Sequence, residues 1–252
     1  MKIVSWNVNG LRSIVRKNCI EQIFRLDPDI ICFQETKLSD ESIFTEIVPS
    51  NYTVFNHLSM DKGRNGVCII SKLPVSQVLE KIGHDRFDSE GRYLSVKLEN
   101  GWSIVNLYMP HGKRDKTQIP YKLDVAKALL DFFQTNKTEK RILCTDFNIA
   151  HKTIDLCRAK ENRNNTMFTV EERAIVDSLL DLGFVDAFRK ICGETGYYTW
   201  WPYGFQARER NIGWRIDYFF VNEMYQNNII KVDIKNSFLG SDHCPMIMEI
   251  DT

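Results

Sequence analysis

Short runs of apolar and β-branched residues recur along the whole chain, and they limit its fold more than any other feature. Runs of this length are typical of buried β-strands. Several are separated by only a few residues, which indicates hairpin-like connections. The predicted strands are Lys2–Trp6, Asp29–Phe33, Gly66–Ser71, Tyr93–Leu98, Ser103–Met109, Arg141–Cys144, Ile216–Val221 and Met246–Ile250.

Apolar residues at helical spacing fill some of the intervals. The predicted helices are Asn18–Leu26, Tyr121–Phe133 and Val170–Leu182. The first stops at Asp27-Pro28, because proline disfavours helical backbone in the residue before it. The third has Thr169 as N-cap, Glu172 three residues on and Gly183 at its end, which is a typical pattern of helix start and stop. Strands outnumber helices, so the sequence predicts a layered α/β fold with mixed sheets.

Composition excludes several classes of protein. Lysine and arginine number 33 and aspartate and glutamate also 33, which excludes a wholly basic nucleic-acid binder but allows a local basic cleft. The seven cysteines are scattered without a CxxC pair, so neither structural zinc nor a disulfide framework is expected. No linker, repeat, signal peptide or membrane-length apolar stretch is visible. We therefore expect one domain over residues 1–252, in a reducing cytoplasm and away from membranes.

Polar side chains lie where buried strands should end in turns. Asn7 and Glu35 each follow an apolar run, as does Asp146 with Asn148 two residues later; Asp217 and the pair Asp242-His243 complete the set. Ionisable groups at the ends of apolar strands are costly to bury unless they are paired or bind a metal. We therefore expect them to converge on one acidic cleft. Carboxylates and amides without cysteine suit Mg²⁺ or Mn²⁺ better than zinc.

These residues belong to motifs that occur in order from one end of the chain to the other. The resemblance is carried by Asn7, Gln34-Glu35-Thr36-Lys37, Asn106-Leu107-Tyr108-Met109-Pro110, Asp146-Phe147-Asn148, Trp200-Trp201, Gly213-Trp214-Arg215-Ile216-Asp217-Tyr218 and Ser241-Asp242-His243-Cys244-Pro245. Together they resemble the exonuclease III family of apurinic/apyrimidinic (AP) endonucleases. The resemblance implies a four-layer α/β sandwich, with two mixed β-sheets packed face to face and flanked by helices.

The resemblance also implies roles in phosphodiester hydrolysis. Asp146 would be the general base that deprotonates a water, and Asn148 would hold that water or a phosphate oxygen. Tyr108 would donate a hydrogen bond to the phosphate. His243 would contact the phosphate as an imidazolium, its charge held by Asp217, because a carboxylate partner raises a histidine pKa.

The implied metal site is made of oxygen ligands. Glu35 would ligate the ion that stabilises charge on the leaving 3′ oxygen. Asp242 would be a second ligand or part of the charge network around the histidine. Asn9 stands where some members carry an aspartate ligand, and Asn7 completes the family's catalytic set rather than its metal ligands. The expected cofactor is Mg²⁺, with Mn²⁺ as the alternative.

Aromatic, amide and basic residues indicate how double-stranded DNA with abasic sites or 3′ ends would be held. Trp200 and Trp214 match the walls of the family's pocket for a flipped, base-free sugar, and Asn162 and Asn165 match its phosphate-contacting amides. Loop cations near these positions are expected to contact phosphates, with Arg114 and Arg210 the residues singled out. No obligate protein partner is evident.

The chain departs from the family's pattern in three places. Thr145 stands where glycine usually precedes the Asp-Phe-Asn motif, and His111 replaces a common asparagine. Thr166-Met167 stands in place of Ala-Gly, so Met167 adds bulk at the border of the abasic pocket. We therefore hypothesise that AP-site incision is weakened while 3′-end processing survives, since a terminal nucleotide need not be extruded in the same way.

Two other interpretations share some of these residues. A relative that hydrolyses phospholipid headgroups or inositol phosphates would keep the Asn, Glu, Asp-Phe-Asn and Ser-Asp-His positions, but the Trp200-Trp201 pair and Gly213-Trp214-Arg215 favour DNA repair. A DNA-binding protein without activity is disfavoured because no required side-chain type is missing. The ratio of AP-endonuclease to 3′→5′ exonuclease activity, the number of metal ions and the oligomeric state stay open.

Overall fold

The apolar runs form two mixed six-stranded sheets in the computed structural model, which describes residues 1–135 and 139–252. The first sheet has the order β11 (Ile229–Ile234), β12 (Met246–Ile250), β1 (Lys2–Asn7), β2 (Ile30–Gln34), β4 (Val67–Ser71), β3 (Thr53–His57). The second has the order β5 (Val75–Leu79), β6 (Tyr93–Leu98), β7 (Trp102–Tyr108), β8 (Lys140–Asp146), β10 (Asp217–Asn222), β9 (Phe184–Asp186). In each sheet one neighbouring pair is parallel, β1 with β2 and β7 with β8.

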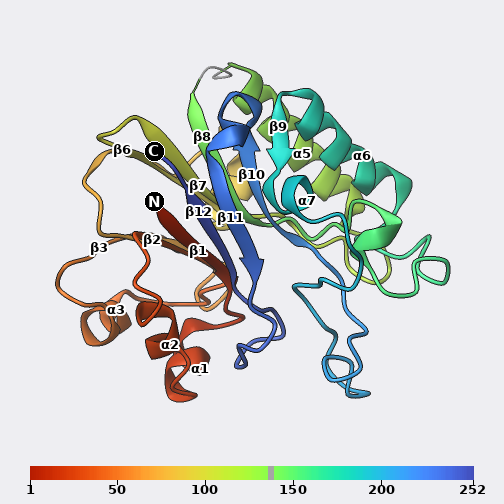
Figure 1. Cartoon of the computed structure of the whole chain (residues 1–252), viewed down its shortest axis with the longest axis horizontal. Helices are drawn as coiled ribbons and strands as arrows, with labels where there is room; N and C mark the ends of the chain where they lie inside the picture. The colour runs from red at the N-terminus through yellow and green to blue at the C-terminus, as the bar shows by residue number, and fades with distance from the viewer. Residues whose placement is uncertain (136–138) are drawn as a thin grey trace.

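The two sheets pack face to face and helices cover their outer faces (Figure 1). Successive residues of a strand point to opposite faces, so Ile3 and Ile104 pack between the sheets while Val4 and Val105 pack against helices. The first sheet is covered by α1 (Leu11–Arg16), α2 (Ile20–Phe24) and α3 (Ser42–Ile47), and the second by α5 (Ile119–Thr135) and α6 (Val170–Asp181). Short α4 (Asp85–Ser89), α7 (Ala187–Ile191), η1 (Thr153–Asp155) and η2 (Glu223–Asn228) lie in connections. The predicted four-layer α/β sandwich is confirmed.

Sequence analysis missed β3, β5, β9 and β11, and these are the four edge strands of the two sheets. An edge strand exposes part of its surface, so it carries no continuous apolar run. In β5, four of the five side chains are exposed. The short helices were missed for a similar reason, because five or six residues show no helical period.

The boundaries of several predicted elements differ in the structure, and two of the differences bear on the site. β8 extends to Asp146 and β10 begins at Asp217, because these residues continue the strand pairing. α2 is shorter than predicted, whereas α5 is longer at both ends. The N-cap of α6 is as predicted: Thr169 and Glu172 form a reciprocal capping box.

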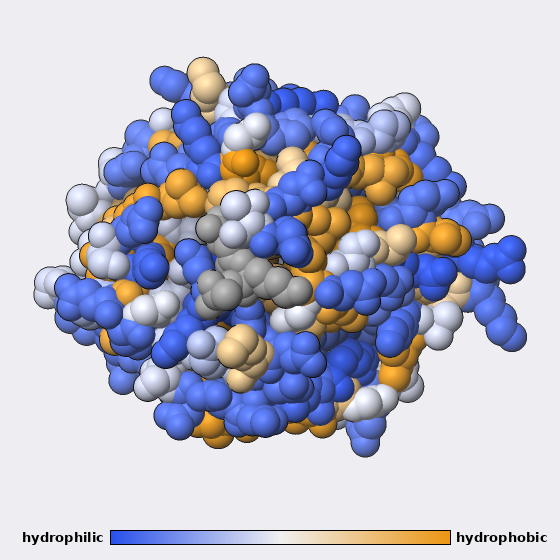
Figure 2. All heavy atoms as spheres, turned by 90° about the horizontal axis from the view of Figure 1, so that it is seen from above, coloured by the Kyte–Doolittle hydropathy of each residue, from blue (hydrophilic) through white to orange (hydrophobic). Residues whose placement is uncertain are grey.

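The surface in Figure 2 is mostly hydrophilic, with hydrophobic side chains scattered among the polar ones. All seven cysteines are free. Among the described residues, no helix has both the length and the hydropathy needed to cross a bilayer.

A buried network of charged side chains links η1, the end of β9 and the segment that precedes β10. Arg215 is completely buried, with Nε 2.8 Å from Asp155 Oδ1 and Nη2 2.7 Å from Asp186 Oδ2. Arg215→Met would leave two buried carboxylates short of a cation, so we expect a loss of about 3–5 kcal/mol in unfolding free energy. Urea unfolding at constant m-value measures this. Arg25→Met, at an exposed ion pair with Glu21, should cost at most about 1 kcal/mol; equal losses in the two variants would refute the role given to Arg215.

Candidate active site

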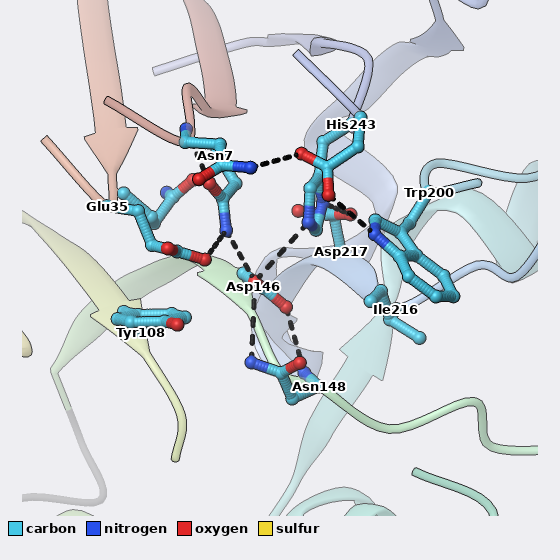
Figure 3. A network of polar contacts seen from close by, with 12 residues as sticks. Asn7, Glu35, Tyr108, Asp146, Asn148, Trp200, Ile216, Asp217 and His243 are labelled. Atoms are coloured by element: carbon cyan, nitrogen blue, oxygen red, sulfur yellow. Dashed lines mark hydrogen bonds and ion pairs between the residues drawn. The ribbon is translucent and has the colours of Figure 1, made fainter. Parts of the chain in front are cut away.

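The strand register brings the polar strand ends together. In the second sheet Tyr108 pairs with Asp146, and Asp146 pairs with Asp217, so the three lie in one row. In the first sheet Asn7 ends β1 beside the end of β2, which leads into Glu35. The amide of Asn7 joins the two rows, because Nδ2 lies 2.7 Å from Asp146 Oδ2 and 2.8 Å from Glu35 Oε1 (Figure 3).

Asp146 lies buried at the centre of this arrangement. Its Oδ1 accepts a hydrogen bond from the backbone N–H of Asn148 at 2.9 Å, and its Oδ2 lies 3.9 Å from His243 Nε2. Burial and the neighbouring Asp217 carboxylate raise the pKa of Asp146 to about 7, against the opposing pull of His243. A carboxylate with a pKa near neutrality is well matched to accept a proton from water.

His243 and Asp217 form a buried dyad. The imidazole Nδ1 lies 2.9 Å from Asp217 Oδ2. Burial alone would lower the pKa of His243, but the carboxylates of Asp217 and Asp146 outweigh it and raise that pKa to about 10. The side chain is therefore an imidazolium at neutral pH, and Nε2–H is left to point toward Asp146 and the site. Trp6 Nε1 donates a hydrogen bond of 3.1 Å to the backbone carbonyl oxygen of His243.

The Glu35 carboxylate and the Asn9 amide oxygen both contact the ammonium of Lys37, and we call these two oxygen groups the oxygen cradle. Lys37 Nζ lies 2.9 Å from Glu35 Oε2 and also donates to Asn9 Oδ1. Burial acts to raise the pKa of Glu35, but Lys37 and Asn7 outweigh it and keep the pKa below its ordinary value. Glu35, Lys37 and Asn9 all have left-handed backbone, an unfavourable conformation that clusters at functional sites. Carboxylate and amide oxygens around one cation fit a hard divalent ion.

Asp242 lies on the other side of Asn9. Its Oδ1 accepts from Asn9 Nδ2 at 2.9 Å and its Oδ2 from Trp200 Nε1 at 3.0 Å. It also raises the pKa of His243. These contacts favour its predicted alternative as part of the charge network; its role as a metal ligand stays a prediction. Among the described residues, the acidic and histidine side chains close enough to share an ion are instead Asp146, Asp217 and His243, but the last of these is protonated.

Tyr108 opens onto a groove of about 590 Å³ beside Glu35. Burial and the Glu35 carboxylate hold the pKa of Tyr108 well above its ordinary value, so the side chain is a phenol that can donate. The Arg92 guanidinium stacks 4.5 Å from the centre of its ring. His111 lines the same groove, and its Nδ1 lies 2.8 Å from the backbone N–H of Lys113.

The predicted abasic pocket is occupied by protein side chains. The rings of Trp200 and Trp214 pack edge to face, with their centres 6.5 Å apart. Met167 and Ile216 belong to the same hydrophobic cluster. Met167 is 5% exposed and has φ 69°, a conformation that glycine adopts without strain and methionine does not. The Met167 side chain thus lies in the hydrophobic cluster that contains Trp214 and against which Trp200 packs.

The other residues predicted to contact DNA lie on loops around this cluster. Among the described residues, none of them forms a hydrogen bond to the carboxylates of Glu35, Asp146 or Asp217. Asn165 Nδ2 donates to Asn162 Oδ1 at 2.7 Å, so the two amides hold each other. Arg114 is exposed, and Arg210 contacts the carbonyl of Phe205 in its own loop. Their roles in DNA binding stay predictions.

Comparison with known proteins decides the family. The Endonuclease/Exonuclease/phosphatase family matches residues 4–243. The chain belongs to this family. It is 40% identical to the exodeoxyribonuclease of Bacillus subtilis (strain 168), with all of both chains covered. Among solved structures, it resembles an AP endonuclease from Archaeoglobus fulgidus (31% identity, TM-score 0.89) and the 3′-5′ exonuclease from Neisseria meningitidis (28% identity, TM-score 0.86), again over the full length of each chain.

Membership of the Endonuclease/Exonuclease/phosphatase family confirms the identification as an exonuclease III-type hydrolase. Sequence analysis nevertheless missed several residues that shape the site. Lys37 was part of a quoted motif but received no role, although a lysine two residues after a carboxylate is a simple signal for an ion pair. Thr199 Oγ1 accepts from the backbone N–H groups of Ile216 and Asp217, and no local pattern marks it.

Proposed function

We propose that this chain is a divalent-metal-dependent DNA phosphodiesterase of base-excision repair, which removes nucleotides from 3′ ends and incises 5′ of abasic sites to leave a 3′-hydroxyl. One observation supports it above the others: a buried Asp146 with a pKa of about 7 faces an imidazolium at His243, and Asn7 joins Asp146 to Glu35. Base, phosphate-binding cation and metal-binding carboxylate thus lie side by side, joined by the Asn7 hydrogen bonds and the ion pair of His243 with Asp146. DNA as substrate follows from relatives named exodeoxyribonuclease and AP endonuclease.

The reaction is a hydrolysis at phosphorus. Asp146 takes a proton from a water held with the help of Asn148, and the water oxygen attacks phosphorus as the bond to the 3′ oxygen breaks. The leaving electron pair stays on that oxygen, which takes up a proton from solvent water and becomes the 3′-hydroxyl. His243 Nε2–H and the Tyr108 hydroxyl donate to non-bridging oxygens, where charge develops. A dead DNA-binding protein would not need this arrangement.

Mg²⁺ is the proposed cofactor, and Glu35, Asn7 and Asn9 are the residues that would hold it, with Asp242 as the second carboxylate. When bound, the ion supplies positive charge to the leaving 3′ oxygen. The oxygen-only cradle around the Lys37 ammonium supports this choice.

Glu35→Gln should raise the Mg²⁺ concentration needed for half-maximal activity by about 10- to 100-fold, because a neutral amide replaces one of the two carboxylates proposed to hold the ion. EDTA should abolish activity in the parent protein, and added Mg²⁺ should restore it. Titration of each variant with Mg²⁺ measures the effect, and Glu46→Gln on α3 is the control. An unchanged Mg²⁺ requirement in Glu35→Gln would place the ion elsewhere.

We also propose that Met167 biases the enzyme toward 3′ ends. A base-free sugar would have to enter between Trp200 and Trp214, where the Met167 side chain packs. Met167→Gly should therefore raise AP-site incision by about tenfold or more relative to 3′-nucleotide removal, since one or two methylenes of misfit change rates on this scale. Met167→Ala, which removes bulk but keeps a Cβ, should give a smaller rise. Parallel initial rates on the two substrates measure this, and an unchanged ratio in both variants would contradict it.

Two labelled duplexes test the proposed function itself. One carries a single internal abasic analogue, and the other is intact with a recessed 3′ end. With Mg²⁺ we expect a ladder from the recessed end and slower incision directly 5′ of the abasic site, both lost in EDTA. No cleavage of either duplex, with hydrolysis of a phospholipid headgroup or an inositol phosphate instead, would overturn DNA as the substrate.

A further inference from the structure

A buried ion pair lies directly behind the loop that carries Asp146 and Asn148. Lys122 of α5 and Glu172 of α6 have side chains with no exposed surface, and Lys122 Nζ lies 2.8 Å from Glu172 Oε1. The same Nζ lies 2.7 Å from the backbone carbonyl oxygen of Asn148. The ammonium therefore bonds to one carboxylate and to one carbonyl of the catalytic loop.

The two helices do not need this pair in order to pack. Val125 and Leu129 of α5 already share a hydrophobic cluster with Ile175 and Leu179 of α6. Burying two charges is costly, and an apolar pair of similar volume is often equally stable. The bond to the Asn148 carbonyl is what an apolar pair could not supply.

Asn148 depends on such a bond for its orientation. Its φ of 52° is left-handed, a conformation that asparagine adopts more readily than most residues when local hydrogen bonds hold it. Its backbone N–H donates to Asp146 Oδ1 at 2.9 Å and its Nδ2 to the Met109 carbonyl at 3.0 Å. Lys122 holds the remaining backbone group, a buried carbonyl that would otherwise lack a donor. The three bonds together fix Asn148 against Asp146.

Glu172 extends the connection to the loop before α6. Its Oε2 accepts from the N–H of Thr169 at 3.2 Å. Thr169 is the N-cap of α6 and directly follows Met167 and Phe168. The backbone N–H of Ala150 donates to the Met167 carbonyl at 2.8 Å. The loop that follows Asp146 and the loop that carries the predicted DNA-contacting amides are thus tied to one buried charge pair.

We propose that Lys122 is a positioning residue that orients Asn148 for the reaction, and that Glu172 holds Lys122 in place and anchors the loop of residues 162–168. This rests on the proposed function. Lys122 acts through Asn148 and touches no substrate. A lysine at a core position of α5, in helical register with Val125, Leu129 and Phe133, is the sequence signal for it.

The double variant Lys122→Met/Glu172→Leu tests the proposal, because it removes both charges and keeps the volume. We expect kcat for 3′-nucleotide removal to fall about 10- to 100-fold, with KM within threefold and little change in melting temperature. Asn148→Ala should cost much less in this background than in the parent, because both changes disturb the same group. Lys127→Met, at an exposed position of α5, should leave kcat unchanged.

Parental kcat in the double variant, or losses that simply multiply with that of Asn148→Ala, would overturn the proposal. If the double variant does not fold, Lys122→Met/Glu172→Gln decides, since it also removes both charges while the glutamine oxygen can still accept from the Thr169 N–H. Its kcat should fall about tenfold or more at unchanged KM, and parental kcat in this folded variant would overturn the proposal. Asp146→Asn runs alongside: if that variant stays active, the proposed function fails, whatever Lys122 does.

Discussion

Asp146→Asn is expected to lower kcat on both DNA substrates by about 10²–10⁴-fold, the range that a positioned general base contributes. The amide keeps the shape of the side chain and can still accept from the Asn148 N–H. It cannot take a proton from water. KM should change little, because the Asp146 side chain is only 1% exposed and acts on the attacking water.

Single-turnover rates with excess enzyme measure this loss without interference from product release. Asp177→Asn is the matched control, since that carboxylate pairs with His151 on the exposed side of α6 and should keep full activity. Circular dichroism of both variants checks the fold. A loss below fivefold in a folded Asp146→Asn protein would assign the base to another residue.

Asp217→Asn should shift the whole pH–rate profile toward acid and lower its maximum by about 10²–10³-fold. In the parent, activity should rise with pH as Asp146 ionises near 7 and fall as His243 loses its proton near 10. The Asp217 carboxylate raises both pKa values. Without it, the rising limb moves below 7 because Asp146 ionises more easily, and the falling limb moves down from about 10 because the imidazolium has lost its partner.

The measurement is kcat/KM against pH for the parent and for Asp217→Asn, which reports the free enzyme's groups. Asp124→Asn is the control, because Asp124 contacts His84 at an exposed ion pair far from this network in sequence and should leave the profile in place. A falling limb that stays near 10 in Asp217→Asn would show that the dyad does not set the protonation of His243.

The sequence predicts the central strands and the polar residues at their ends, because each is a local pattern. It could not supply the register, which places Asp146 opposite Asp217 and Tyr108. The raised pKa of Asp146 depends on that register, since Asp217 comes from a strand about 70 positions later in the chain. Edge strands such as β5 could not be predicted, because an exposed strand carries no continuous run of apolar residues.

The roles of residues that act through tertiary contacts were also beyond the sequence. Lys37 contacts Glu35 and Asn9, and Lys122 contacts the Asn148 carbonyl. Spacing marks both lysines in the sequence, but the atoms that they contact are set by the tertiary fold. The sequence predicts Met167 as bulk beside the pocket, and its place in one hydrophobic cluster with Trp214 agrees with that hypothesis. Its left-handed backbone could not be read from the residue itself.

Hydrolysis in ¹⁸O-labelled water tests most directly whether a water attacks phosphorus and the 3′ oxygen leaves, which is the reaction assigned to the site around Asp146. The recessed-end duplex is cut under single-turnover conditions, and the released 5′-mononucleotide and the new strand end are examined by mass spectrometry. We expect one ¹⁸O atom in the phosphate of the mononucleotide and none in the 3′-hydroxyl of the strand. Label in the 3′-hydroxyl, or unlabelled phosphate, would contradict attack of water on phosphorus.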